Sequence, residues 1–278
     1  MMAKACALAF YLLGLGLLAV AAELPVEDNA RSRPLFEWSG FLEHAHSHND
    51  YEQARPLHDA LASGITSLEA DLWLEGDTIM VGHSLKTLRG SLEALYLEPL
   101  HEAWMHNRLP TGTAGRFLLW LDLKDPNPQL RKKLHGLLSR FPMFSARQAR
   151  RADCRVILTG HEQSKHEYVR AFPSDNFSRD SNLFTITDPP ATPQWEWYAL
   201  DWKKIGAWDG HGAMPPVERA HLRELVESIR QKGRKVRLWN NPATLSFWRE
   251  AAAAGVDLIG TDVLPRPSTP ADDRRKQP

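Results

Sequence analysis

The chain has 278 residues, of which 34 are Lys or Arg and 34 are Asp or Glu, so its formal net charge is zero when histidine is neutral. This balance excludes the strongly basic surface of a dedicated nucleic-acid-binding protein. With 43% hydrophobic and 24% charged residues, the composition is that of a globular protein rather than a disordered one. A chain of this length fits one large domain, and an α/β barrel is among the commonest solutions at this size.

The N-terminal segment has the pattern of a secretory signal peptide. Lys4 precedes an almost wholly apolar run from Ala5 to Leu18, and small residues follow up to Ala22. The run is shorter than the roughly 20 residues of a membrane-spanning helix, so we expect cleavage near Ala21 or Ala22 and a secreted or periplasmic protein. The predicted organisation is a signal peptide over residues 1–22, one domain over 35–264 and a polar, disordered tail over 265–278.

Along the domain, apolar strand candidates alternate with amphipathic helix candidates, which is typical of a parallel sheet. The strand candidates are residues 41–46, 66–72, 116–123, 155–159, 183–187, 195–201, 235–239 and 256–260, with a short returning strand at 77–81. The helix candidates are residues 56–63, 92–106 (interrupted near Pro99), 128–140, 216–232 and 243–254. This alternation predicts a single-domain (β/α)8 TIM barrel, closed or somewhat distorted.

Acidic residues lie on two neighbouring strands of the predicted barrel. Glu69 and Asp71 are two residues apart on one strand, so both carboxylates point to the same side. Asp122, on the next barrel strand, supplies a third carboxylate. Confined like charges are costly unless a cation joins them, and three carboxylates suit one divalent cation, Mg²⁺ or Ca²⁺. The alternative explanation is a set of structural ion pairs with Lys124 and nearby arginines.

Two histidines lie where they could act on a phosphodiester. His46 ends the first predicted strand, and His83 follows the returning strand. One imidazole can take a proton from the attacking hydroxyl group while the other gives a proton to the leaving alkoxide. The metal ion and Lys124 would neutralise the charge that develops on the phosphoryl oxygens.

Five short motifs follow one another in a consistent order. They are His46-Ser47-His48-Asn49-Asp50-Tyr51, Ser67-Leu68-Glu69-Ala70-Asp71, Val81-Gly82-His83-Ser84, Leu121-Asp122-Leu123-Lys124 and Gly255-Val256-Asp257-Leu258-Ile259-Gly260-Thr261-Asp262. Together they resemble the phospholipase-C-like phosphodiesterase superfamily, which includes glycerophosphodiester phosphodiesterases, phosphatidylinositol-specific phospholipases C and sphingomyelinase D. The nearest likeness is to a branch with a His-Xaa-His-Asn-Asp-Tyr motif.

The resemblance implies a metal-dependent enzyme that cleaves a glycerol- or lipid-type phosphodiester. The residues that it implies are catalytic His46, His83 and Lys124, substrate-binding His48, Asn49 and Trp239, and metal-binding Glu69, Asp71 and Asp122. The chain lacks the His-Arg-Gly motif and the Glu-Asn pair usual in glycerophosphodiester phosphodiesterases. The catalytic role therefore stays open between His46 and His48.

The expected partners are a small-molecule or lipid phosphodiester and, peripherally, a membrane surface, with no nucleic acid, and we expect a monomer.

Two other functions are compatible with the sequence. One is a zinc amidohydrolase-like barrel whose ligands include His46, His48 and Asp262. The other is a non-catalytic barrel that binds lipid headgroups or glycans through an aromatic rim. The rim would consist of Trp195, Trp197, Trp202 and Trp208.

Overall fold

The computed structural model describes residues 42–110, 112, 115–144, 154–174 and 176–264. The predicted signal peptide and the predicted C-terminal tail lie outside the described residues. Within the described part of the chain, no helix is both long enough and apolar enough to cross a membrane.

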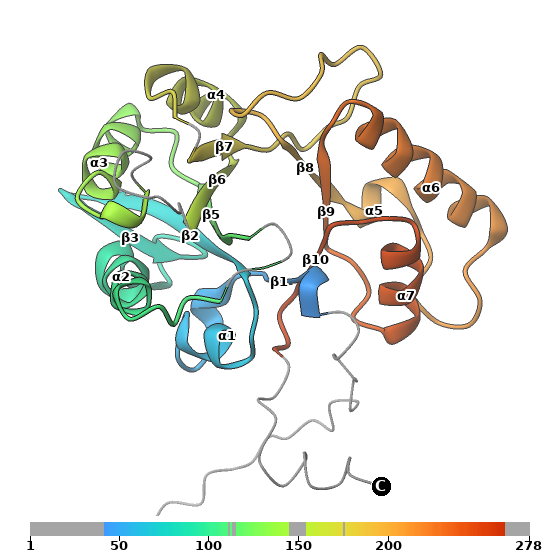
Figure 1. The fold of residues 1–278 in the computed structure, drawn as a ribbon, viewed down its shortest axis with the longest axis horizontal. Coiled ribbons are helices and arrows are strands. Elements are labelled where there is room, and N and C mark those ends of the chain that lie inside the picture. The colour runs from blue at the N-terminus through green and yellow to red at the C-terminus, as the bar shows by residue number, and fades with distance from the viewer. Residues whose placement is uncertain (1–41, 111, 113–114, 145–153, 175, 265–278) are drawn as a thin grey trace, which may run out of the picture. The chain divides into compact units, whose positions relative to one another are not determined.

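Eight parallel strands form the barrel that the alternating pattern predicts. They are β1 (Ala45–Ser47), β2 (Ser67–Glu75), β5 (Phe117–Leu123), β6 (Cys154–Gly160), β7 (Phe177–Arg179), β8 (Trp197–Asp201), β9 (Lys235–Trp239) and β10 (Leu258–Thr261). They pair in the order β7, β6, β5, β2, β1, β10, β9, β8. A bridge between Arg179 and Trp195, and backbone hydrogen bonds from Ser181 to β8, join the two end strands. The ring is therefore nearly closed (Figure 1).

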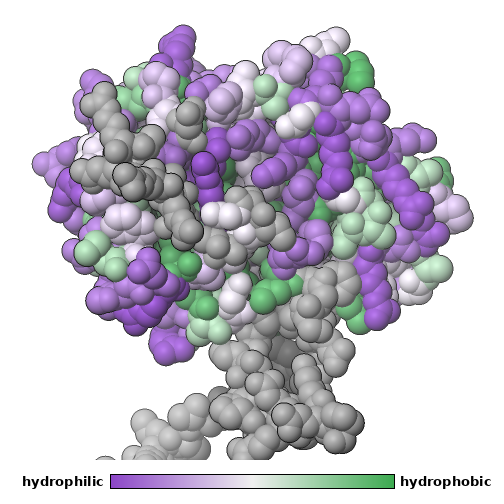
Figure 2. All heavy atoms as spheres, in the orientation of Figure 1, coloured by the Kyte–Doolittle hydropathy of each residue, from purple (hydrophilic) through white to green (hydrophobic). Residues whose placement is uncertain are grey.

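Helices lie outside this ring of strands (Figure 1). They are α1 (His58–Ala62), α2 (Glu98–Met105), α3 (Pro128–Leu138), α4 (Glu162–Ala171), α5 (Trp202–Ile205), α6 (Pro216–Gln231) and α7 (Leu245–Ala253). A π-helical turn over Glu93–Leu97 leads into α2, and three short 3₁₀ helices cover Leu42–His44, Asp50–Glu52 and Pro142–Phe144. Hydrophilic residues cover most of the face seen in Figure 2, as expected for helices whose polar sides face solvent.

An antiparallel hairpin extends the barrel sheet beside β2. It consists of β3 (Thr78–Gly82), which pairs with β2, and β4 (Leu88–Ser91), which pairs with β3. The sequence pattern predicted β3 as the returning strand but not β4. Since β3 runs back along β2, the residues that follow it, beginning with His83, come near the Asp71 side chain.

The predicted fifth barrel strand at residues 183–187 is wrong. Its apolar residues Leu183 and Ile186 are 73% and 68% exposed and lie in the loop between β7 and β8. The actual fifth strand is β7, whose Ser178 and Arg179 are buried despite their polarity. Polar residues inside a barrel do not give the apolar run by which a buried strand is recognised.

Side chains alternate between the inside and the outside of the barrel along β2. Leu68, Ala70 and Leu72 belong to the main hydrophobic cluster that also contains the buried faces of the helices. Glu69 and Asp71 take the alternate positions and point inward. A separate apolar cluster occupies the barrel interior and consists of Leu118, Trp120, Ile157, Trp197, Ala199 and Leu258, with Trp239 packed against it.

The aromatic rim predicted from the tryptophans is also wrong. Trp197, Trp202 and Trp208 are buried in hydrophobic clusters. Trp195 is partly buried, with the guanidinium groups of Arg179 and Arg234 at 4.1 and 3.7 Å from its ring centroid. Three of the four rings are therefore buried in the fold and cannot form an exposed rim for sugars or headgroups.

Asp50 fixes the segment that follows β1. Its buried carboxylate accepts hydrogen bonds from Ser47 Oγ at 2.7 Å, from the Leu57 backbone N–H at 2.6 Å and from Tyr96 Oη at 3.0 Å. Burial raises the pKa of Asp50, while these donors lower it in part. The carboxylate thus links β1, the residue that precedes α1 and the π-helical turn through hydrogen bonds.

Asp50→Ala should lower the free energy of unfolding by about 2–4 kcal/mol, because three buried donors lose their acceptor at once. Urea unfolding followed by circular dichroism measures the change. Asp77→Ala is the matched control, since Asp77 is exposed on the turn before β3, and it should unfold like the parent protein. Equal stability of the two variants would contradict this role for Asp50.

Candidate metal centre

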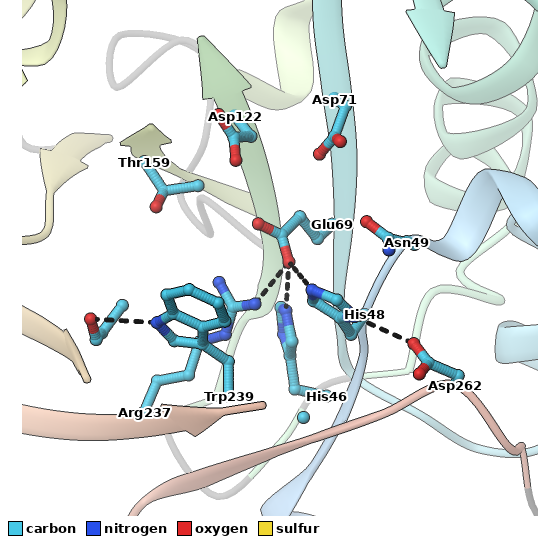
Figure 3. Close-up of polar contacts among 12 residues, drawn as sticks. His46, His48, Asn49, Glu69, Asp71, Asp122, Thr159, Arg237, Trp239 and Asp262 are labelled. Carbon is cyan, nitrogen blue, oxygen red and sulfur yellow. Dashed lines mark hydrogen bonds and ion pairs between the residues drawn. The ribbon is translucent and has the colours of Figure 1, made fainter. Parts of the chain in front are cut away.

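The three predicted carboxylates converge inside the barrel. Glu69, Asp71 and Asp122 each offer one oxygen atom, and these atoms all lie within 4.8 Å of one another. All three residues are buried. The parallel register of β2 and β5 pairs Asp71 with Asp122, while Glu69 lies one pleat earlier on the same face. The view in Figure 3 shows the three carboxylates facing a common space.

Two oxygens of this cluster have no hydrogen-bond partner. Asp71 Oδ1 and Asp122 Oδ1 are buried, and no donor among the described residues reaches them. Buried acceptors are nearly always satisfied, so a pair without partners calls for an explanation such as an ion. Oxygen-only ligands from three carboxylates suit a hard divalent cation such as Mg²⁺ or Ca²⁺. The residues present therefore fit the predicted metal.

Gly160 leaves the space that Asp122 occupies. A Cβ atom built at this position would lie 1.9 Å from Asp122 Oδ1, and the backbone φ of +87° is one that residues with a side chain rarely adopt. Gly160 ends β6, the strand next to β5. A glycine at this point thus allows the third carboxylate to turn into the cluster.

Lys124 pairs with the two aspartates, as the alternative explanation predicted. Its Nζ atom lies 2.6 Å from Asp122 Oδ2 and 3.2 Å from Asp71 Oδ2. Burial lowers the pKa of Lys124, but the two carboxylates outweigh it and raise the pKa overall. Tyr51 Oη also donates to Asp71 Oδ2 at 2.8 Å. Lys124 and Tyr51 both donate to Oδ2 atoms. The ion pair is therefore compatible with a metal ion bound on the side of the Oδ1 atoms.

The pKa of Asp71 is raised to about 7, first by burial and then by the neighbouring charges of Asp122 and Glu69. The carboxyl group is therefore half protonated near neutral pH in the protein without an ion. A divalent cation would favour the ionised form, because it supplies the positive charge that the cluster lacks.

Arg237 is the main residue of the site that the sequence analysis missed. It is buried on β9, its guanidinium group forms an ion pair with Glu69 Oε2 and it lies 4.9 Å from the Trp120 ring centroid. Burial alone would raise the pKa of Glu69, but Arg237 holds it well below its usual range. Arg237 is two residues before Trp239 on one strand, and this spacing is the signal that could have placed it inside the barrel.

A second buried polar group lies beside the cluster. Asp180 directly follows β7 and accepts hydrogen bonds from Thr159 Oγ1 at 2.7 Å and from Lys165 Nζ at 2.5 Å. Both of its carboxylate oxygens are therefore occupied. Asp180 joins α4 to the barrel interior and is not one of the three convergent carboxylates.

The structure separates the two histidines of the first motif by depth. His46 is fully buried, with Nδ1 2.8 Å from Ser67 Oγ and Nε2 3.5 Å from Glu69 Oε2. Burial, followed by the charge of Arg237, lowers the pKa of His46 to about 3. Both ring nitrogens thus have protein partners, and the ring is closed off from solvent.

His48 is the more accessible of the two, with 28% of its side chain exposed. Its Nδ1 atom lies 2.9 Å from Asp262 Oδ1, and its Nε2 atom lies 3.9 Å from Glu69 Oε2 (Figure 3). Burial lowers the pKa of His48, but the hydrogen bond to Asp262 and the charge of Glu69 raise it overall. Asp262 fixes the orientation of this imidazole, as a carboxylate partner does in many histidine sites.

The remaining predicted residues surround the cluster. His83 Nδ1 lies 3.8 Å from Asp71 Oδ2, and 66% of the His83 side chain is exposed. Asn49, in the left-handed region at φ 47°, has its Oδ1 atom 2.9 Å from Tyr51 Oη. Trp239 is partly buried, and its Nε1 donates to the Ala199 carbonyl at 3.3 Å. Every predicted site residue thus comes from the carboxyl-terminal end of the barrel.

Comparisons with known proteins agree with a phosphodiesterase-like domain. A family profile described as "AIM6-like phosphodiesterase domain" matches residues 41–114. The protein named "Altered inheritance of mitochondria protein 6" of Eremothecium gossypii is 32% identical over 274 residues, covering 80% of this chain and 68% of that protein. The homolog of Arthroderma benhamiae is 26% identical over 256 residues, covering 78% and 80%. The protein of Lachancea thermotolerans is 48% identical over 275 residues, covering 79% and 63%.

These findings confirm the phosphodiesterase part of the predicted resemblance at a coarse level. The prediction of a secreted or periplasmic protein is wrong, because the relatives carry a name that refers to mitochondrial inheritance. That prediction rested on residues 1–22, which lie outside the described residues.

The affinity of the centre for Mg²⁺ or Ca²⁺ should fall as the pH is lowered below 7. A cation binds the ionised carboxylate, so below the pKa of Asp71, about 7, it must displace a proton. We expect a loss of about tenfold per pH unit and little change above neutral pH. Isothermal titration across this range measures the affinity, and equal affinity at about pH 6 and about pH 8 would contradict the assignment.

Proposed function

The chain belongs to the family of Altered inheritance of mitochondria protein 6, and from this membership we propose that it cleaves a phosphodiester at the centre formed by Glu69, Asp71 and Asp122. One observation carries the proposal above all. Three buried carboxylates converge with two unpartnered oxygens, and two partly exposed imidazoles lie beside them. A cation and two proton-transfer groups are the components that phosphodiester cleavage needs.

A divalent cation, Mg²⁺ or Ca²⁺, held by the three carboxylates would supply positive charge for the oxygens of the phosphoryl group. Lys124 places an ammonium group at the edge of the same cluster, with 30% of its side chain exposed. In our proposal this ammonium group binds a phosphoryl oxygen of the substrate and neutralises charge that develops there.

We assign the proton transfers to His48 and His83. Both rings are partly exposed, and they approach different carboxylates of the cluster, Glu69 and Asp71. One imidazole removes the proton of the attacking hydroxyl group as the new P–O bond forms. The other donates a proton to the alkoxide as the old P–O bond breaks. His46 is a positioning residue in this scheme, because its buried ring contacts Glu69 and has no access to a substrate.

The substrate class that we propose is a glycerol- or lipid-type phosphodiester. The ordered motifs resemble enzymes that act on such esters, and the partly buried Trp239 ring at the end of β9 offers an apolar wall beside the polar cluster. The zinc amidohydrolase alternative is less well supported. In the described ranges, the convergent set of potential ligands contains carboxylates and does not include His46, His48 or Asp262.

Activity on a panel of glycerophosphodiesters, lysophospholipids and bis(4-nitrophenyl) phosphate should depend on a divalent cation. A chelator should abolish turnover, and Mg²⁺ or Ca²⁺ should restore it. Asp122→Asn should lower kcat/KM by about 10²–10³-fold, since one ligand charge is lost. Asp77→Asn, at an exposed aspartate on the turn before β3, is the matched control and should keep full activity. Turnover that persists in chelator would overturn the proposal.

The choice of the leaving group separates the roles of the histidines. Replacing the general acid with Asn should lower kcat on an alkyl ester by about 10²–10⁴-fold. Much of this loss should disappear on a 4-nitrophenyl ester, whose leaving group needs no proton. Either His48→Asn or His83→Asn should show this rescue.

His46→Asn is the comparison for that experiment. Its defect should be similar on both esters and should come with weaker cation binding, because the substitution disturbs Glu69. If His46→Asn were rescued by the good leaving group and neither of the other two variants were, His46 would be the general acid instead.

A further inference from the structure

A second cavity lies at the opposite end of the barrel from the metal centre. It has a volume of about 350 Å³. Its walls come from the amino-terminal ends of strands: Arg116 precedes β5, Trp197 begins β8, Lys235 begins β9 and Leu258 begins β10. The carboxylate cluster lies toward the carboxyl ends of the strands, so the two sites are distinct. The volume is within the usual range for a small-molecule site, roughly 300–1,000 Å³.

Two cations, Arg116 and Lys235, line this cavity. Arg116 Nη1 is buried and has no hydrogen-bond partner in the described part of the chain. Lys235 Nζ lies 5.3 Å from the Trp197 ring centroid, and its charge interacts with the Asp257 carboxylate. A buried guanidinium N–H without an acceptor is costly, so an acceptor from outside the protein would be favourable here.

Two acidic residues, Glu43 and Asp257, also line the cavity. Asp257 Oδ2 accepts a hydrogen bond from the Val236 backbone N–H at 2.9 Å, and Asp257 Oδ1 lies 3.7 Å from Arg230. The Glu43 carboxylate is 3.8 Å from the His44 ring. Since Asp257 also interacts with Lys235, Arg116 is the cavity cation to which the described residues offer no ion pair.

The inner wall of the cavity is apolar. Leu118, Trp197 and Leu258 line it, and all three belong to the hydrophobic cluster inside the barrel. The Trp197 ring packs edge to face on Trp120 at 5.2 Å, and Trp120 packs in the same way on His46 at 5.4 Å. The cavity therefore combines an apolar wall with two cations, and the fluorescence of Trp197 can report on a bound ligand.

We propose that this cavity is a second ligand site, specific for a small amphiphilic anion. The phosphate or carboxylate group accepts hydrogen bonds from Arg116 and an ion pair from Lys235. The apolar part of the same molecule lies against Leu118, Trp197 and Leu258. Charge-assisted hydrogen bonds from a guanidinium group are among the strongest in proteins, so the head group supplies the specificity. This site is independent of the phosphodiesterase proposal.

Titration of the whole chain with four probes tests the site. Octyl phosphate and octanoate should bind and change the tryptophan fluorescence, and the tighter of the two identifies the preferred head group. Octanol and inorganic phosphate should each bind at least about tenfold more weakly. Octanol lacks the anionic group, and inorganic phosphate lacks the apolar chain. Equal binding of octanol and both anions would overturn the proposal, and so would no binding of either anion.

Substitutions then locate the binding. Arg116→Gln and Lys235→Gln should each weaken the binding of the amphiphilic anions by about tenfold or more. Arg89→Gln, an exposed arginine on β4, is the matched control and should bind like the parent protein. Binding should also persist in Asp122→Asn and in chelator. Loss of binding in Asp122→Asn with retention in Arg116→Gln would place the anion at the metal centre and overturn the proposal.

Discussion

The mutual repulsion of three buried carboxylates is the constraint on which the rest of this site depends. Glu69, Asp71 and Asp122 offer oxygens within 4.8 Å of one another, in a place with little access to water. Without compensation these groups could not all be ionised. Arg237 keeps Glu69 charged, and Lys124 bridges the other two. The compensation is incomplete, because two Oδ1 atoms still lack a partner, and a divalent cation would complete it.

The interior of the barrel changes in character along its axis, and this change separates the two proposed sites. The carboxyl-terminal end contains the acidic cluster and the histidines. Packed apolar and aromatic side chains, centred on Trp120 and Trp197, fill the middle. Two cations, Arg116 and Lys235, line a cavity at the amino-terminal end. A cation-binding end and an anion-binding end can coexist in one small domain because a packed core keeps them apart.

In the proposed mechanism, the depth of each histidine in the barrel decides its role. His46 and His48 are two residues apart, yet one ring is sealed in the core and the other reaches the surface. Residues that orient a ligand benefit from burial and fixed partners, whereas proton transfer needs access to substrate and a nitrogen that is not already bonded. Asp262, from the end of the last strand, orients His48. Membership of the family of Altered inheritance of mitochondria protein 6 fits a phosphodiesterase built in this way.

Much of this arrangement follows from local patterns in the sequence. Alternation of apolar strands with amphipathic helices predicted the barrel, and the spacing of two between Glu69 and Asp71 predicted that both face inward. Placing Asp122 beside them required only that successive barrel strands be neighbours, and the register of β2 and β5 confirms it. Local patterns failed for β7, where buried polar residues form the strand and the apolar stretch at 183–187 is exposed.

The sequence by itself determined the barrel and its three convergent carboxylates, because strand periodicity and chain order are properties of neighbouring residues. Only the tertiary structure decided which cation stands beside Glu69, since Arg237 is 168 residues away along the chain. It also decided how deep each histidine lies and which cations line the cavity at the far end of the barrel. Burial and pairing depend on what the nearly closed ring of strands brings together, and no short stretch of sequence contains that information.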